Sequence, residues 1–421
     1  MTAPLTDQHG DGMLPAVPLG ERTLVHRHPV YATTGVVLGY ALRIHVTPTL
    51  EPGEDLVAAV QEVSLTLDLP GLVADRLCFL PATPQMLAGQ LPRLDSPSGL
   101  VLELSPALVA APETYEQVVS LYEFGVQLLI ADYTGSDAQD HLLPFATFVS
   151  LLPGLPTERL ASAVTRAHAA GKVAIAFGVD DEISEEVCRL AGVDAVCTTR
   201  GGLNHAWAEP PRREPAPTKV LRAGQMQCLA VLDLLPRDEP DIEGVIQIIE
   251  TDPVLTLRML HLVNSGAFGV RHEVDTVGHA VLLLGPQETM ALVVGLLVDA
   301  RPDVMDSLWF ILARAQACES LAGDPAAYTV GMLSSLSVQL GVPDEVLLEA
   351  VATTPAVEDA IRSETGPYGP VLAAVRGHEA GNHQKILDAG MQPATVSAAY
   401  VAAVTHALAT AQAVTPRTTP S

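Results

Sequence analysis

At residues 234–270 the chain reads LLPRDEPDIEGVIQIIETDPVLTLRMLHLVNSGAFGV. Asp241 precedes apolar residues at helical spacing, and Asp252-Pro253 is a strong helix start, with aspartate as the N-cap and proline at the first helical position. The helix after Pro253 should end at Asn264-Ser265-Gly266. Its apolar residues form a wide surface, which predicts a central place in a helical bundle: Val254, Leu255, Leu257, Met259, Leu260 and Leu262.

The remainder of the second half also has helical patterns. One helix should run from a Thr276 cap to Gly285, and Pro286 should open the next, because glycine favours helix ends and proline favours helix starts. Further helices are predicted at residues 306–321, 326–340, 343–352, 369–379, 383–389 and 393–411. The second half therefore predicts a compact all-α domain.

The first half alternates short apolar, β-branched runs with amphipathic stretches. A helix is predicted at residues 157–171, which end on glycine. Strands buried on both faces and separated by helices indicate parallel βα units. About 190 residues of this pattern suffice for a compact (β/α)8 barrel. The predicted strands lie at residues 101–104, 126–132, 148–152, 172–179 and 194–199.

The boundary between the halves is a proline-rich segment. Residues 209–218, EPPRREPAPT, hold four prolines in ten positions, which disfavours both helix and strand. Residues 1–20 and 411–421 are polar and aperiodic, and we expect flexible tails there. The sequence thus predicts a barrel at 21–208, a linker at 209–218 and a helical domain at 219–410.

Composition excludes several classes of protein. The 421 residues carry 49 acidic and 23 basic side chains, a formal charge of −26, which disfavours direct nucleic-acid binding. The longest uninterrupted apolar runs, such as residues 291–298, fall short of a membrane span, and the N-terminus lacks a secretory pattern, so a cytoplasmic location is expected. The five cysteines are scattered without a C-x-x-C pair, which predicts reduced core residues.

Two family resemblances cover nearly the whole chain apart from its tails. Residues 234–270, with TVGHAVLLLG at 276–285, resemble the HDOD domain. Residues 27–31, RHPVY, and 39–42, GYAL, resemble the start of an EAL domain, and the order EAL then HDOD matches a bacterial signalling architecture. The resemblance implies an α/β barrel of the (β/α)8 type followed by an all-α bundle. The HDOD signature residues are Asp252, Pro253, Asn264, Ser265, Phe268 and Gly285.

An active EAL domain hydrolyses cyclic di-GMP with two metal ions held by carboxylates and an amide. On this resemblance, two of eight functional positions keep a carboxylate, Glu103 and Asp132. Two carboxylates do not hold two divalent cations without compensating ligands. The resemblance therefore implies a degenerate phosphodiesterase, with no catalytic residue, metal or cofactor. The six altered positions hold Ala41, Pro81, Ala131, Ser150, Phe177 and Cys197.

Other groups were weighed as metal ligands. Asp180, Asp181 and Glu182 follow a predicted strand, where helix capping is favoured over metal binding. The second half also resembles HD-type phosphohydrolases, but their metal-binding His and His-Asp positions fall on Ile311, Ser334 and Ser335, which cannot form that site.

Six histidines outside those positions were also considered. His26 and His28 alternate on a predicted strand, so their rings can share a metal, although no acidic or cysteine partner lies nearby in sequence. The sequence favours ordinary roles for this pair. His378 and His383 are expected as exposed polar residues flanking a turn. His261 and His279 are expected to be partly buried in apolar helices.

The sequence thus predicts a cytoplasmic signalling or scaffold protein that is not an enzyme and acts through contacts with other signalling proteins, not with nucleic acid or membrane. One alternative is a cyclic di-GMP receptor that binds without hydrolysis. Against it, Ser150 replaces the family's catalytic lysine and Arg200 is the only obvious basic residue at a late strand end. Another is an active phosphodiesterase with rearranged ligands, which predicts bound metal. A homodimer through the barrel is compatible with the sequence.

Overall fold

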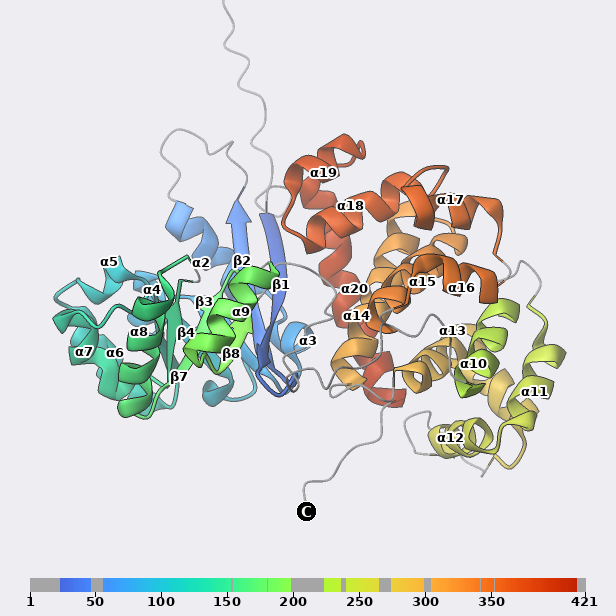
Figure 1. Cartoon of the computed structure of the whole chain (residues 1–421), viewed down its shortest axis with the longest axis horizontal. Coiled ribbons are helices and arrows are strands. Elements are labelled where there is room, and N and C mark those ends of the chain that lie inside the picture. The colour runs from blue at the N-terminus through green and yellow to red at the C-terminus, as the bar shows by residue number, and fades with distance from the viewer. Residues whose placement is uncertain are drawn as a thin grey trace, which may run out of the picture.

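The computed structural model describes an N-terminal barrel and a C-terminal helical domain (Figure 1). The predicted N-terminal tail and linker lie outside the described residues, whereas residues 411–414 of the predicted C-terminal tail continue a helix. The described residues are 23–46, 56–152, 154–179, 181–197, 223–235, 240–264, 274–298, 304–340, 342–351 and 353–414.

Eight strands close the barrel in sequence order. They are β1 (Thr23–Ala32), β2 (Val37–Val46), β3 (Leu77–Pro81), β4 (Leu100–Leu104), β5 (Gln127–Ile130), β6 (Phe148–Leu151), β7 (Val173–Phe177) and β8 (Ala195–Cys197). The five strands predicted from β-branched runs are confirmed as β4 to β8, and the (β/α)8 class is confirmed.

One strand departs from the predicted parallel arrangement. β1 runs antiparallel to both of its neighbours, β2 and β8, whereas β2 to β8 run parallel. A parallel crossover needs about a dozen residues. The short turn between Ala32 and Val37, with Gly35 at a φ of +80°, permits only a hairpin.

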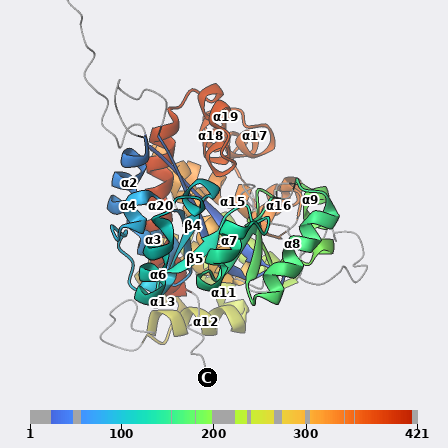
Figure 2. The ribbon, with the colours of Figure 1, turned by 90° about the vertical axis from the view of Figure 1, so that its left-hand side faces the viewer.

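Helices cover the outside of the barrel, and Figure 2, seen from the barrel side, shows them in front of the helical domain. The interior is a packed apolar core that includes Val30, Phe79, Phe148 and Ile175. The helices are α2 (Leu56–Thr66), α3 (Leu69–Val73), α4 (Pro84–Leu87), α5 (Pro106–Val109), α6 (Thr114–Phe124), α7 (Asp137–Leu142), α8 (Thr157–Ala169) and α9 (Glu182–Ala191), with 3-10 turns at Pro97–Gly99 and Leu143–Phe145.

The second domain is all-α, as the sequence predicts. Its helices are α10 (Ala223–Leu234), α11 (Ile242–Thr251), α12 (Pro253–Asn264), α13 (Val277–Leu297), α14 (Val304–Ala322), α15 (Ala326–Leu340), α16 (Asp344–Ala350), α17 (Pro355–Ser363), α18 (Gly369–Glu379), α19 (His383–Asp388) and α20 (Pro393–Val414). The predicted break within α13 is confirmed at Gly285, whose φ is +75°. The sequence missed α10 and α17.

The predicted central place of α12 is wrong. Leu255, Met259 and Val263 are buried, but Leu257 is 68% exposed. α12 packs against α11 and α13 at the edge of the domain (Figure 1), so only one side of its apolar surface meets the core.

Two described helical segments, Val277–Leu297 and Pro393–Gln412, have the length and apolar composition needed to cross a membrane. Within the fold, 56% and 44% of their apolar windows are buried. The prediction from the sequence concerned uninterrupted apolar runs, whereas mean hydropathy tolerates spaced glycine, serine and threonine, so these two helices pass by length and composition alone.

The five cysteines are buried and form no disulfide with one another, which confirms their predicted place in the core. Burial raises the pKa of Cys78 and of Cys318 to about 12, so these thiols are protonated at neutral pH.

The two domains meet in a polar and aromatic interface. α20 packs against β1 and α3, and α18 also contacts β1. The Arg27 guanidinium lies 3.3 Å from the ring centroid of Tyr40 and 3.8 Å from that of Trp309, so it is held between one aromatic ring from each domain. The Tyr40 hydroxyl donates to Asp306, which also pairs with Arg76 at 2.8 Å. Barrel and helical domain thus share buried polar contacts.

Gly331 in α15 marks a close approach to α14. A Cβ atom there would lie 2.7 Å from the backbone of Arg314 and Ala315, nearer than side chains tolerate. We expect Gly331→Ala to lower the free energy of unfolding by about 1–3 kcal/mol, because the helices must separate. Chemical unfolding followed by circular dichroism measures this. Gly154→Ala, where an added Cβ meets nothing within 4 Å, is the control; equal stabilities of the two variants would contradict the close-packing argument.

Candidate functional site

The carboxyl ends of the parallel strands form the barrel mouth, the end at which barrels of this class carry their sites. The structure brings the eight family-matched positions to this end. In strand register, Pro81 lies beside Glu103 and Phe177 beside Cys197. Ala41 lies beside Phe79. The family-matched positions therefore lie together at one end of the barrel.

Arg43 and Glu103 form the main polar contact of the mouth. Both terminal nitrogens of the Arg43 guanidinium donate to the Glu103 carboxylate, at 2.9 and 3.1 Å. The side chains are 25% and 11% exposed, so the pair lies at the surface of the mouth but is largely sheltered. Burial raises the pKa of Glu103, while the Arg43 charge and hydrogen bonds oppose this and the Asp132 charge adds to it.

An aromatic group lies beneath this ion pair. The Phe79 ring packs edge-to-face against Phe148 and Phe177, at centroid distances of 5.4 and 6.4 Å. The Arg43 guanidinium lies 5.1 Å from the Phe177 centroid. Ala41, fully buried, belongs to the same apolar core. Where the family has ligand carboxylates, this mouth therefore has an apolar floor.

Asp132 follows β5 in a left-handed conformation, with a φ of +49°. Its N–H donates to the Ser150 hydroxyl at 3.1 Å, and its carbonyl accepts from the Gln139 side chain at 3.0 Å. Gln139 is itself fixed in the capping box of α7. This backbone conformation costs free energy in a non-glycine residue. It persists because the hydrogen bonds around Asp132 hold it in place.

The two-metal centre implied by the resemblance does not fit these residues. The Glu103 carboxylate is already bound by the Arg43 guanidinium. Among the eight family-matched positions, Asp132 is then the one remaining carboxylate. Within the described part of the chain, no group of three or more His, Cys, Asp or Glu side chains is arranged to hold a metal ion. Asp180 and Arg200 lie outside the described residues, as does the Glu182 side chain. Asp181 caps α9 by accepting from the Ser184 N–H at 2.8 Å.

The three positions that match HD-type metal ligands lie inside the helical domain. Ile311, Ser334 and Ser335 are fully buried. The Ser334 hydroxyl donates to the Gly331 carbonyl at 3.0 Å, and Ser335 donates to the same carbonyl. These hydroxyls are therefore bonded within their own helix.

The described HDOD signature residues have structural contacts. Asp252 caps α12 by accepting from the Leu255 N–H at 3.2 Å. Asn264 is the last residue of α12, and its side chain exchanges two 2.8 Å hydrogen bonds with the backbone of Val274, because the amide matches a peptide group. Ser265 and Phe268 lie outside the described residues, and nothing is described of the Pro253 side chain.

Sequence reasoning missed Arg43 and the meeting of His26 with His378 and His383. Arg43 lies two residues after Ala41 on β2, so it faces the same side, and its register partner on β1 is His26. The strand period could have identified Arg43 as a mouth residue. The spatial meeting of His26 with His378 and His383 joins positions about 350 apart and carries no local signal.

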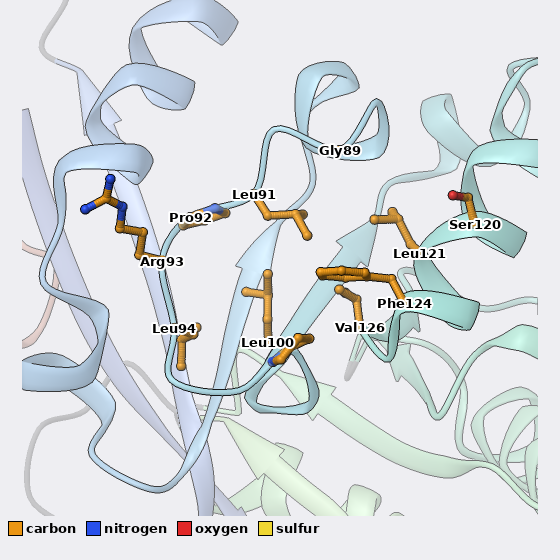
Figure 3. A pocket seen from close by; sticks show the side chains of 11 residues that line it. Gly89, Leu91, Pro92, Arg93, Leu94, Leu100, Ser120, Leu121, Phe124 and Val126 are labelled. Atoms are coloured by element: carbon orange, nitrogen blue, oxygen red, sulfur yellow. The ribbon is translucent and has the colours of Figure 1, made fainter.

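A second feature lies at the opposite end of the barrel. A pocket of about 570 Å³ opens where β4 and β5 begin. Figure 3 shows Leu91, Leu121 and Phe124 converging on it, whereas Arg93 points away. Its lining is mainly apolar, so it lacks the convergent polar groups that a specific small-molecule site requires.

Comparisons with known proteins give a family match in the second half and relatives that align with most of the chain. Residues 226–310 match the family model of the HDOD domain, which confirms the resemblance in the second half. YuxH of Bacillus subtilis, an uncharacterized protein, is 21% identical over 396 residues, covering 88% of this chain and 94% of the relative. Cyclic di-GMP phosphodiesterase CdgJ of Vibrio cholerae is 22% identical over 374 residues, covering 83% of each chain.

Solved structures are similar to part of this chain. An EAL domain protein from Listeria monocytogenes covers 42% of this chain and 86% of its own, with 14% identity and a TM-score of 0.33. Klebsiella pneumoniae BlrP1, solved with manganese and cyclic di-GMP, covers 47% of this chain and 57% of its own, with 14% identity and a TM-score of 0.36.

The match to CdgJ contradicts the prediction that this chain is not an enzyme. A protein named as a cyclic di-GMP phosphodiesterase aligns with 83% of the chain, a span too long for either domain alone. The prediction compared single ligand positions with a family pattern. That comparison takes no account of other residues of the mouth that could replace the missing ligands. The chain is therefore similar, across both domains, to a protein named as a cyclic di-GMP phosphodiesterase.

Proposed function

Because this chain carries an HDOD domain behind an eight-stranded barrel, we propose that it is a cyclic di-GMP signalling protein whose barrel mouth engages the dinucleotide. The observation that carries the proposal is the alignment with CdgJ across both domains. In this proposal the barrel binds the nucleotide, and the helical domain binds protein partners in a way that depends on whether the barrel is occupied.

The mouth has groups suited to a nucleotide. Arg43 presents a partly exposed guanidinium, whose planar fork of donors matches phosphate oxygens. Phe177, partly buried beside it, offers a ring of the kind on which nucleobases stack. Glu103 competes for Arg43, so binding of a phosphate exchanges one anionic partner of the guanidinium for another.

One strand supports communication between the mouth and the helical domain. Tyr40 and Arg43 are three residues apart on β2, so they face opposite sides of the sheet. Arg43 lies at the mouth, whereas Tyr40 contacts Trp309 and Asp306 of α14. A ligand that moves Arg43 therefore acts on a strand that the helical domain holds from its other face.

We expect Arg43→Ala to weaken cyclic di-GMP binding by about 10- to 100-fold, because a charge-assisted contact to phosphate is lost. Isothermal titration calorimetry of the full chain in EDTA measures binding without metal-dependent turnover. Glu103→Gln removes the competing carboxylate and should strengthen binding. The matched control is Arg189→Ala, which makes the same charge change at an exposed pair with Glu186 on α9.

No measurable binding by the natural chain would overturn the proposal, as would equal weakening by Arg43→Ala and Arg189→Ala. Hydrolysis is followed separately by chromatography of the nucleotide after incubation with Mg²⁺ or Mn²⁺. Formation of linear product identifies the bound dinucleotide as a substrate, whereas unchanged cyclic di-GMP identifies it as an effector.

A further inference from the structure

Five histidine rings meet where the barrel mouth touches the helical domain, and we call them the interface histidine cluster. His26 and His28 lie on β1 and His45 on β2, while His378 ends α18 and His383 begins α19. The His26 ring lies 4.6 Å from His378, 5.4 Å from His383 and 5.5 Å from His45, measured between centroids. Solvent exposure increases across the cluster from buried His378 to exposed His45, so the cluster is open to solvent on one side.

The exposed, turn-flanking role predicted for His378 is wrong. His378 is 1% exposed, because α18 packs against β1 at this point. Neither nitrogen of its ring has a well-formed hydrogen bond. Burial lowers the pKa of His378 well below the usual range and lowers that of His26 to about 3, with the neighbouring histidines adding to both effects.

The hydrogen bonds of His26 fix its tautomer. Its Nδ1 atom lies 2.9 Å from the carbonyl oxygen of His378, and a carbonyl can only accept, so Nδ1 carries the proton. The Nε2 atom of the neutral ring therefore has a free lone pair. An Nδ1–H bound to a backbone carbonyl is also the usual outer support of a metal-ligating histidine.

The free Nε2 atom of His26 faces another imidazole nitrogen. The Nε2 atoms of His26 and His383 are 3.2 Å apart. Two imidazole nitrogens that share a tetrahedral metal at about 2.0–2.1 Å lie about 3.3–3.4 Å apart. The observed separation is close to that of such a pair. The ring planes are 18° apart and their centroids 5.4 Å apart, so the two Nε2 atoms point at each other, and both rings must tilt to aim their lone pairs at one ion.

We propose that His26 and His383 bind a divalent transition-metal ion, of the class of Zn²⁺ or Ni²⁺, that links the barrel rim to the helical domain. Imidazole nitrogen suits these ions better than Mg²⁺ or Ca²⁺. Without metal, the two rings share an N–H···N hydrogen bond. The proposal does not rest on cyclic di-GMP binding, since neither histidine belongs to the Arg43–Glu103 pair.

The remaining coordination positions are filled from the open side. No ready set of three ligands exists among the described residues, so the site is a two-histidine site that water completes. His45 is the nearest addition: it is exposed, and its ring lies 5.5 and 6.2 Å from those of His26 and His383. Rotation of its side chain can bring a third nitrogen to the ion.

We expect the EDTA-stripped full chain to bind one Zn²⁺ per molecule in isothermal titration calorimetry, with a rise in the Tm that grows with zinc concentration. His383→Ala should weaken zinc binding by about tenfold or more and abolish the Tm rise, because it removes one of two protein ligands. His383 begins a surface helix, so this variant tests the site even if His26→Gln fails to fold.

His406→Ala is the matched control, since His406 is exposed on α20 outside the cluster and should leave zinc binding unchanged. His45→Ala should produce a smaller loss than His383→Ala. Absence of zinc binding by the natural chain would overturn the proposal, and so would zinc affinity that His383→Ala and His406→Ala reduce equally.

Discussion

Arg314→Met should lower the free energy of unfolding by about 3–5 kcal/mol, because it leaves a buried carboxylate without its partner. The guanidinium of Arg314 donates to Glu379 at 3.0 and 2.6 Å, and the two side chains are 2% and 3% exposed. The pair joins α14 to α18 in the centre of the helical domain. Urea unfolding followed by circular dichroism measures the loss.

The double replacement Arg314→Met with Glu379→Leu is the decisive control. It removes both charges and keeps an apolar side chain of similar size at each position, so most of the lost stability should return. If the double variant is as unstable as Arg314→Met alone, the loss comes from packing and not from an uncompensated charge.

This ion pair also lies beside two of the positions that match HD-type metal ligands. Arg314 lies one turn after Ile311, and its guanidinium donates to the carbonyl of Ser334 at 3.1 Å. Ile311 and Ser334 are positions where the resemblance to HD-type phosphohydrolases would place metal ligands. The chain thus holds a cation of its own, fixed by a protein carboxylate, beside the place where those enzymes hold metal.

Much of the fold could be predicted because local signals determine it. Asp252 is predicted as a helix cap and Asp241 as the residue before a helix, and both accept backbone hydrogen bonds at helix starts. Gly285 was identified as a break, and its positive φ accounts for it. The later barrel strands were found because parallel strands buried on both faces are continuous apolar runs.

What the sequence did not predict depends on contacts between distant residues. Leu257 is exposed because α12 packs against α11 and α13 on one side only, and the sequence does not show which helices will lie beside it. The bond between Arg43 and Glu103 joins different strands, so family matching identified Glu103 as retained without revealing that a guanidinium occupies it. The meeting of His26 with His383 depends on how the two domains dock.

The incorrect prediction about enzymatic activity has the same origin. On the resemblance, Ala41 and Phe177 depart from the family's ligand pattern, and both contribute to an apolar floor. Activity, however, is a property of the whole mouth, and a position-by-position comparison cannot assess groups that reach it from elsewhere. The similarity to CdgJ spans both domains, so it covers more of the chain than the eight compared positions do.

The second large effect is expected at the domain interface, where Trp309→Ala should lower the free energy of unfolding by about 3–5 kcal/mol. Trp309 is fully buried, and its indole N–H donates to the Val404 carbonyl at 2.6 Å. Its ring also packs edge-to-face against Tyr40 and lies over Arg27. Removing the ring therefore leaves a cavity and uncovers a guanidinium held between two aromatic rings.

Trp309→Phe separates the two contributions of this side chain. It keeps an aromatic ring beside Arg27 and Tyr40 but loses the N–H, so its cost should fall below that of Trp309→Ala. Urea unfolding gives the stabilities, and small-angle X-ray scattering of the folded variants reports whether the domains remain docked. Because Trp309 contacts the barrel through Tyr40 and Arg27, Trp309→Ala should increase the radius of gyration, whereas Trp309→Phe should not. An unchanged radius with an equally large loss of stability in both variants would place the role of Trp309 within the helical domain alone.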